Sequence, residues 1–481
     1  MSVSSLASAY CPPFLRPAME RVQNSPIGYR LASGVFWSMA GAVISRGLML
    51  VASVFVARLL GKTGYGELGI IRSTVMMFGV FAGFGLGLTA TKYVAEFRQS
   101  DPARAGRIIG LSGLFATLTS GLMALGLFLF APWLAEHTIN APHLAGVLRI
   151  GALILFISGI NGAQTGALSG LEAFKTIAYV NLFTGLASFP VLIAGTYFGG
   201  LTGAVWATTV SLGLNWLLNH LALRREAARH HVPFIFENCV REWSVLWRFS
   251  LPAVLSGALV GPVTWACSAL LVNRPGGYGE MGIYSAANQW FAILFFLPGL
   301  LSQVLLPVLS DQLGQQDIRQ SMTTLKLAIT LNLLVVAPFA ILASVASPYI
   351  MGLYGDGFKA GWPTLVLVLV AATLHALETP PLRLLAAAGR MWLDLTTNAV
   401  WALILFVCTV LLVHLGAVGV AAANTISYLL VSPWIILVAI LQIRRRLGDR
   451  GQDRPPGESS TLGRDSHSSG WVPERKSLAA P

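Results

Sequence analysis

The stretch VARLLGKTGYGELGI, residues 56–70, has a counterpart in LVNRPGGYGEMGI, residues 271–283. The four letters GYGE recur at 64–67 and at 277–280, an offset of 213 positions. A recurrence over such a distance is the pattern of an internal duplication, although glycine-rich loops between membrane helices also resemble one another. The spacing therefore favours two similar halves.

A second pair of segments supports the duplication. GGLTGAVWATTVS, residues 199–211, resembles LGAVGVAAANTIS, residues 415–427, and places Gly200 on Gly416 at an offset of 216. Because the two offsets nearly agree, the similarity is better explained by duplication than by coincidence.

The composition predicts that a bilayer surrounds most of the chain. The 481 residues are 55% hydrophobic and only 11% charged, and their mean hydropathy is +0.69. One helical crossing takes roughly 20 apolar residues, so this length supplies about a dozen crossings with short connections. Residues 1–30 contain no apolar core of a signal peptide, and we expect them to form a cytoplasmic N-terminal segment.

We therefore predict an all-α polytopic membrane protein with about twelve transmembrane helices in two six-helix parallel repeats around a central cavity. The first repeat occupies 31–223, a cytoplasmic linker 224–245, and the second repeat 246–446. The tail 447–481 is polar and predicted to be disordered. The helices are expected at 33–58, 69–94, 108–132, 145–166, 176–199, 201–223, 246–272, 281–306, 324–348, 362–386, 392–415 and 417–441.

Basic residues predict the orientation of the chain. The loops after even-numbered helices carry most of them, and the last helix ends in Arg444, Arg445 and Arg446. The positive-inside rule then places both termini in the cytoplasm. This distribution also explains the net charge of +12 without nucleic acid as a partner. The four cysteines form no CxxC pair or metal-ligand cluster, so neither disulfides nor a bound metal is expected.

Three segments resemble polysaccharide-biosynthesis membrane proteins of the flippase type. They are SGVFWSMAGAVISRGLMLVASVFVARLLGKTGYGELGI (33–70), GLTATKYVAEFRQ (87–99) and GALSGLEAFKTIAYVNL (166–182). That family shares a superfamily with multidrug-and-toxin exporters and the peptidoglycan-precursor flippase. The resemblance covers roughly 32–446 and implies translocation of an undecaprenyl-diphosphate-linked saccharide from the cytoplasmic to the outer leaflet of the bacterial inner membrane. It also implies membrane lipids and polysaccharide assembly proteins as partners; the simplest oligomeric state is a monomer.

Charged and amide side chains inside the predicted helices are the candidate site residues. Ionisable groups at mid-bilayer cost roughly 2.5–3.5 kcal/mol and usually face an interior cavity. Arg46 lies near the middle of the first predicted helix, and Arg72 enters the second from the outer side. A guanidinium suits the phosphate oxygens of a lipid diphosphate; structural pairing is the alternative. Four amide side chains could donate hydrogen bonds to sugar hydroxyls or accept from them: Asn161, Gln164, Asn288 and Gln289. The alternative is that they form hydrogen bonds between helices.

His375 and Glu378 share one face of the predicted helix 362–386 because they are three residues apart. A buried carboxylate can be neutralised by a proton or by Na⁺, so this pair is a candidate for ion coupling; a structural pair is the competing interpretation. No other cofactor is expected. The corresponding positions of the first repeat fall near Ser158 and Asn161, which are not acidic.

Two other functional classes remain as alternatives. A membrane-embedded polysaccharide polymerase or ligase is disfavoured because the predicted outer loops are short and no P-loop, HExxH or GxSxG motif occurs. A cation- or proton-coupled multidrug exporter of the same superfamily should carry an acidic cavity. Arg46 and Arg72 favour the flippase, whereas Glu378 leaves the exporter open.

Overall fold

The computed structural model describes residues 26–233, 239–243, 258–314 and 318–452. Within these ranges every regular element is a helix. The first half contains α3 (Pro26–Gly83), α4 (Leu86–Phe97), α5 (Pro102–Trp133), η1 (Leu134–Thr138), η2 (Pro142–Leu144), α6 (Ala145–Gly170) and α7 (Phe174–Arg229). The second half, after η3 (Cys239–Trp243), contains α9 (Val260–Val272), α10 (Gly277–Leu294), α11 (Phe296–Gly314), α12 (Ile318–Val345), α13 (Ser347–Leu353), η5 (Asp356–Gly361), α14 (Trp362–Ala387), α15 (Met391–Leu412), η6 (Val413–Leu415) and α16 (Ala417–Gln452).

Two of these helices fold back on themselves at a glycine. α3 has 58 residues, which as a straight helix would be about 87 Å long, nearly three times the roughly 30 Å of bilayer hydrocarbon. Its backbone leaves the helical region at Gly61 (φ 67°, ψ 176°), and that of α7 does so at Gly200 (φ 53°, ψ −137°). Each of the two elements therefore crosses the membrane twice.

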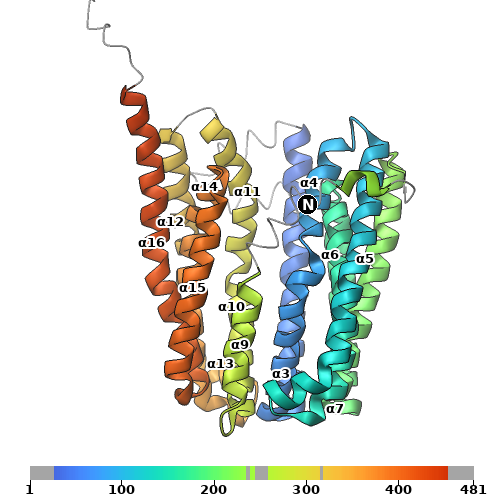
Figure 1. The fold of residues 1–481 in the computed structure, drawn as a ribbon, viewed down its shortest axis with the longest axis vertical. Coiled ribbons are helices and arrows are strands. Elements are labelled where there is room, and N and C mark those ends of the chain that lie inside the picture. Colours follow the sequence, from blue (N-terminus) through green and yellow to red (C-terminus); the bar gives the residue numbers. More distant parts are fainter. Residues whose placement is uncertain (1–25, 234–238, 244–257, 315–317, 453–481) are drawn as a thin grey trace, which may run out of the picture.

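The described residues agree with twelve crossings. Eight of their helices are long and apolar enough to span a membrane, and the bent pair of α10 and α11 makes a ninth. α3 and α7 each count once in that tally but cross twice, and α9 is a shorter apolar helix of 13 residues. Six crossings thus belong to each half, and Figure 1 shows the halves side by side, the first in blue to green and the second in yellow to red.

The turns confirm that the two halves are repeats of one another. Gly416 has φ 67° and ψ −140°, nearly the same conformation as Gly200, with which it aligns in the sequence. A Cβ on Gly203 would overlap the Gly195 carbonyl oxygen, and one on Gly419 would overlap that of Leu412. The same turn, followed by the same close backbone contact, is therefore built twice.

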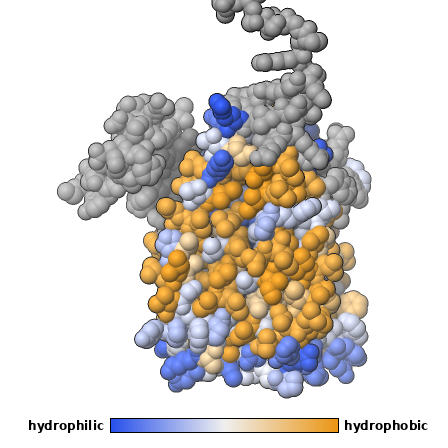
Figure 2. Space-filling model, turned by 90° about the vertical axis from the view of Figure 1, so that its left-hand side faces the viewer, coloured by the Kyte–Doolittle hydropathy of each residue, from blue (hydrophilic) through white to orange (hydrophobic). Residues whose placement is uncertain are grey.

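The ends of the molecule differ from its middle. The glycine turns lie at one end, here called the hairpin end, whereas α4, α7 and α16 finish at the opposite, terminal end (Figure 1). Figure 2 shows a hydrophobic belt between more hydrophilic ends on the second-half face. Within α12, Leu334 and Leu342 are 69% and 70% exposed. Such a continuous apolar surface requires the hydrocarbon of a bilayer as its solvent.

Several predicted boundaries differ from the structure. The segments 69–94 and 281–306 were each expected to be one helix, yet both are interrupted. Phe84 and Gly85 have positive φ before α4 begins, and α10 and α11 are bent by 40° around Phe295. Hydropathy could not reveal these breaks because the sequence stays apolar through both.

The regions outside the repeats are only partly described. α7 continues six residues into the predicted linker, because Ala227 on this extension is buried in the core at the terminal end. Of the predicted N-terminal segment and tail, only 26–30 and 447–452 are described, and both stretches are helical. The rest of these two predictions lies outside the described residues.

Candidate functional site

The two halves meet along a seam that is closest at the hairpin end. There α3 packs against α9 and α10 through the repeated GYGE segments. A Cβ on Gly66 would overlap the Tyr278 carbonyl oxygen, and one on Gly282 would overlap that of Lys62. Glycine is therefore required on both sides, because the two backbones are in direct contact, as in other close helix pairs of membrane proteins.

Hydrogen bonds reinforce the seam at this end. Two side chains of the second half donate to carbonyls of the first, Tyr278 Oη to Ile139 and Asn273 Nδ2 to Thr138, each at 2.7 Å. In the opposite direction, Arg58 Nε of the first half donates to the Leu353 carbonyl of the second at 2.6 Å. In the part of the chain that the structure describes, no comparable packing joins α4 to α11. Among the described residues the halves are therefore closed at the hairpin end, whereas α4 and α11 do not pack on each other toward the terminal end.

Arg46 lies on the seam, where it contacts the bend between α10 and α11. Its Nη1 donates to the Ala292 carbonyl at 3.4 Å, and its Cζ lies 4.3 Å from the centre of the Phe296 ring. The side chain is exposed, and no ion pair joins it to any described carboxylate. Arg46 thus retains a charge that a bound anion could neutralise.

Arg72 lies on α3 beside the same seam. Its neighbours on α3 touch the second half. Gly69, three residues earlier, contacts Ser285. The hydroxyl of Ser73, the next residue, is 3.5 Å from that of Ser268. Arg72 is half-buried, and among the described residues it has no hydrogen-bond or ion-pair partner. On α10, Gln289 follows Ser285 by one helical turn and shares its seam-facing side, with the exposed Asn288 beside it. Four of the predicted site residues therefore gather along the seam.

The other two predicted amides lie inside the first half, away from the seam. Asn161 Nδ2 donates to the Leu212 carbonyl on α7 at 3.2 Å. This is the interhelical bond that the sequence left open as the alternative to sugar binding. Gln164 lines a cavity between α5, α6 and α7, so neither amide is placed beside Arg46 or Arg72.

His375 and Glu378 form the pair that their spacing predicts, inside the second half. His375 Nδ1 and Glu378 Oε1 are 2.8 Å apart, and Ser432 Oγ donates to Glu378 Oε2 at 3.0 Å. The imidazole lies against the rings of Phe295 at 4.4 Å and Tyr428 at 5.0 Å. Glu378 is 4% exposed, so the carboxylate is buried and both of its oxygens are partnered.

The bend between α10 and α11 connects these two charged sites. His375 packs against Phe295 from the second half, while Arg46 packs against Phe296 from the first. Sequence reasoning did not identify either phenylalanine, nor Tyr428 and Ser432. The i, i+4 spacing of Tyr428 and Ser432 was the available signal, but only tertiary packing places them opposite His375 and Glu378.

The fold and the seam define a polytopic transporter built from two six-helix halves. Residues 31–312 match the model of the family described as polysaccharide biosynthesis protein, and the chain belongs to that family. It is 21% identical over 422 residues to the EPS I polysaccharide export inner membrane protein EpsE of Ralstonia solanacearum, covering 85% of this chain and 94% of EpsE. It is 25% identical over 306 residues to the lipid III flippase of Escherichia coli K12, covering 62% of this chain and 71% of that one.

Solved transporters share the fold. An inward-facing multidrug resistance MATE family transporter of the MOP superfamily superposes with a TM-score of 0.67 at 15% identity, covering 85% of this chain and 96% of that one. The lipid II flippase MurJ, in an inward closed conformation, gives a TM-score of 0.63 at 13% identity, covering 88% and 94%. The matches identify a transporter rather than an enzyme, and a multi-pass protein of the inner membrane.

Proposed function

We propose that this protein flips an undecaprenyl-diphosphate-linked oligosaccharide across the inner membrane during the synthesis of a cell-surface polysaccharide. The observation that carries the proposal is the cationic seam. Arg46 contacts it, Arg72 lies beside it on α3, and neither is paired with a carboxylate among the described residues. A diphosphate supplies the missing negative charge, and a planar guanidinium can hold two of its oxygens at once.

Relatives support this choice of substrate. The similar proteins are named for polysaccharide export and for flipping lipid III, so a lipid-linked saccharide is the cargo class to which the chain's resemblance points. The alternative interpretation, a multidrug exporter, depended on Glu378 being an acidic residue of the cavity. Both oxygens of Glu378 are already bonded within the second half, to His375 and Ser432.

The mechanism is alternating access between the two halves. The basic loops support a cytoplasmic position for the terminal end, and with that orientation a molecule closed at the hairpin end receives its substrate from the cytoplasmic side. Binding of the diphosphate at Arg46 neutralises the charge on the seam, after which the halves rock about it and open at the other end. One chain supplies both halves, so a monomer is sufficient, and polysaccharide assembly proteins take over the flipped product.

Ion coupling is assigned to His375 and Glu378. A proton or Na⁺ that neutralises the buried carboxylate would weaken its bonds to His375 and Ser432. Because His375 packs on Phe295, such a change reaches the α10–α11 bend that Arg46 contacts from the other side. The pair could thereby link ion binding to rearrangement of the seam.

Complementation tests the proposal. The gene is deleted in its host, display of surface polysaccharide is followed, and wild type, Arg46→Ala or Arg149→Ala is restored at verified membrane abundance. Arg149 is the matched control because it is an exposed membrane arginine that contacts Phe128 within the first half. We expect Arg149→Ala to restore display and Arg46→Ala to reduce it by about tenfold or more.

Two results would contradict the proposal. If the two arginine variants restore polysaccharide equally well, the cationic seam does not bind the substrate. If deletion leaves polysaccharide intact but increases sensitivity to cationic drugs, the protein is an exporter.

A further inference from the structure

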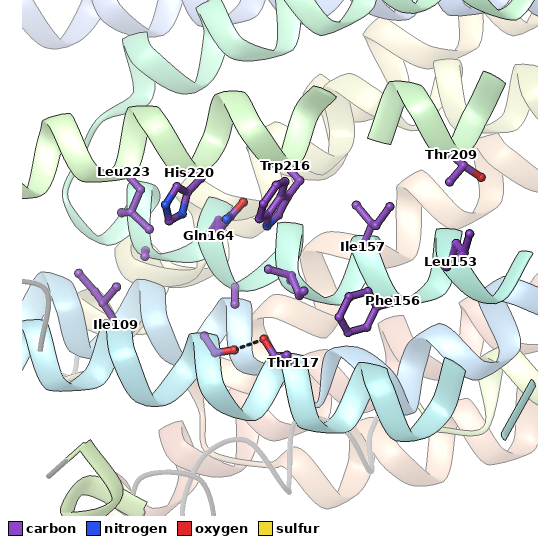
Figure 3. Close-up of a pocket in the computed structure, with 14 residues that line it drawn as sticks. Ile109, Thr117, Leu153, Phe156, Ile157, Gln164, Thr209, Trp216, His220 and Leu223 are labelled. Atoms are coloured by element: carbon purple, nitrogen blue, oxygen red, sulfur yellow. Dashed lines mark hydrogen bonds between the residues drawn. The ribbon is translucent and has the colours of Figure 1, made fainter. Parts of the chain in front are cut away.

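The first half contains a groove that the seam does not use. Its volume is about 590 Å³, within the range of ligand sites, and it lies between α5, α6 and the second segment of α7. α6 forms its floor, whereas α5 and α7 form the two walls without packing closely on each other. Figure 3 shows these three helices with the side chains that line the groove.

The groove opens to the bilayer rather than to the seam. Leu153 and Trp216, both in its lining, are 44% and 39% exposed. The seam is instead built by α3, α9 and α10, none of which contributes a residue to this lining. A molecule in the groove therefore comes from the membrane around the protein and leaves the path between the halves free.

The lining is mostly apolar, and its amide and imidazole side chains lie toward one end of the groove, here called the polar end. Leu153, Phe156 and Ile157 lie at one end of the groove in Figure 3, and Gln164 and His220 lie toward the other. The polar end is the one nearer the terminal end of the molecule, since α7 finishes there. Trp216 stacks on His220 with ring centres 6.0 Å apart, an amphipathic pair suited to the level where hydrocarbon meets lipid headgroups.

Gln164 is the part of this lining whose hydrogen bonds are unfilled. It is 8% exposed, its Oε1 is completely enclosed, and neither amide atom has a partner among the described residues. Unlike Gln164, the two threonines of the lining already have hydrogen-bond partners: Thr117 donates to the Gly113 carbonyl and Thr209 to the Val205 carbonyl. The enclosed Oε1 has no surface open to the groove, so a ligand there can bond only to Nε2, whose lack of a partner at this depth is unfavourable. Figure 3 shows the Gln164 side chain directed between His220 and Trp216.

A positive charge lies next to the polar end. Arg224 follows His220 by one turn of α7, is exposed, and has no ion pair within the described chain. We propose that the groove binds an anionic glycerophospholipid of the surrounding bilayer. One acyl chain lies along Leu153 and Phe156, an ester carbonyl accepts from Gln164 Nε2, and the phosphate lies near His220 and Arg224.

Native mass spectrometry of the full chain in detergent, with phosphatidylglycerol added, tests the site. Gly113 lines the groove, and a Cβ placed there meets nothing within 4 Å, so Gly113→Leu directs its side chain into the space of the groove. Gly126 on the same helix has equally open space but lies outside the lining, which makes Gly126→Leu the matched control. Gln164→Leu removes the amide and provides a second variant if Gly113→Leu does not fold.

We expect one phosphatidylglycerol to be retained by wild type and by Gly126→Leu, and occupancy to fall about tenfold in Gly113→Leu and Gln164→Leu. Phosphatidylcholine with the same chains should bind more weakly, because its headgroup carries no net charge to meet Arg224. Equal retention by all folded variants overturns the site. Equal binding of phosphatidylcholine overturns the anionic assignment, and preferential displacement of phosphatidylglycerol by undecaprenyl phosphate assigns the groove to a polyprenyl chain instead.

Discussion

The two halves use the same turns for different chemistry. Gly200 and Gly416 have nearly identical backbone angles, yet the equivalent central helices, α6 and α14, carry different polar groups. In α14, Glu378 has a partner for each oxygen, whereas in α6 the oxygen of Asn161 and that of Gln164 have none among the described residues. α14 therefore holds an internally satisfied charge, and α6 holds amides whose oxygens have unfilled hydrogen bonds.

This difference shows which features a duplication preserves. Backbone contacts at turns and close helix crossings tolerate only glycine, so they remain alike in the two halves. A side chain on a central helix is constrained by fewer neighbours and can diverge. The shared backbone contacts explain how the halves pack and move together, and the diverged side chains are where binding and coupling can be specialised.

The largest effect is expected where the halves touch. Gly66→Leu places a side chain into the Tyr278 backbone, so the seam cannot close at the hairpin end. An overpacked contact costs about 3 kcal/mol, which lowers the population of the closed state by roughly 100-fold. Display of polysaccharide in the deletion strain should fall accordingly, at unchanged membrane abundance.

Gly47→Leu is the control for this experiment, because Gly47 lies on the same element with nothing within 4 Å of its Cβ position. It should restore display. Full activity of Gly66→Leu would show that the contact between the repeated GYGE segments is dispensable for transport.

The same seam shows how far the sequence could predict the structure. The repeated GYGE letters and the glycine offsets predicted two similar halves, because glycines that are needed for packing recur with the fold. The breaks at Phe84 and Phe295 were not predicted, since apolar residues continue through both and hydropathy does not record a change of direction. Their positions depend on contacts with other helices.

The candidate site, like the fold, could be predicted from the sequence only in part. The spacing of His375 and Glu378 placed them on one face, and the structure joins them at 2.8 Å. Asn161, in contrast, bonds to the Leu212 carbonyl of a helix 51 residues away in sequence. No periodicity within one segment identifies such a partner, because it depends on how two helices are packed.

A second prediction tests whether the second half is specialised for coupling. Glu378→Gln keeps the shape and one acceptor for Ser432 but removes the charge. We expect flipping in inverted membrane vesicles to lose its response to an imposed proton or Na⁺ gradient, while stability falls by only about 1 kcal/mol. Transport at matched protein levels, measured with and without each gradient, decides the question.

Glu280→Gln is the matched control, because Glu280 accepts from the Ala417 amide at the hairpin end and lies outside the pair. It should lose a similar amount of stability and keep its gradient response. If Glu378→Gln also keeps that response and loses only stability, His375 and Glu378 are a structural pair and the two halves do not differ in coupling.

The smallest effect separates the two turns that look alike. Gly200→Ala forces a positive φ on a residue with a Cβ and should cost about 1 kcal/mol, because nothing lies within 4 Å of that Cβ. Gly416→Ala has the same backbone cost, but its Cβ lies 2.5 Å from Glu280 Oε2 and displaces the carboxylate from the Ala417 amide. Thermal unfolding in detergent should therefore show a larger loss for Gly416→Ala.

A double-mutant cycle isolates that extra loss. In a Glu280→Ala background the displaced carboxylate is absent, so Gly416→Ala should cost only about what Gly200→Ala costs, and the coupling between Gly416 and Glu280 should be about 1 kcal/mol. A coupling near zero would mean that Glu280 moves aside freely. The two turns would then be equivalent in energy as well as in shape, and the divergence of the halves would begin only at their central helices.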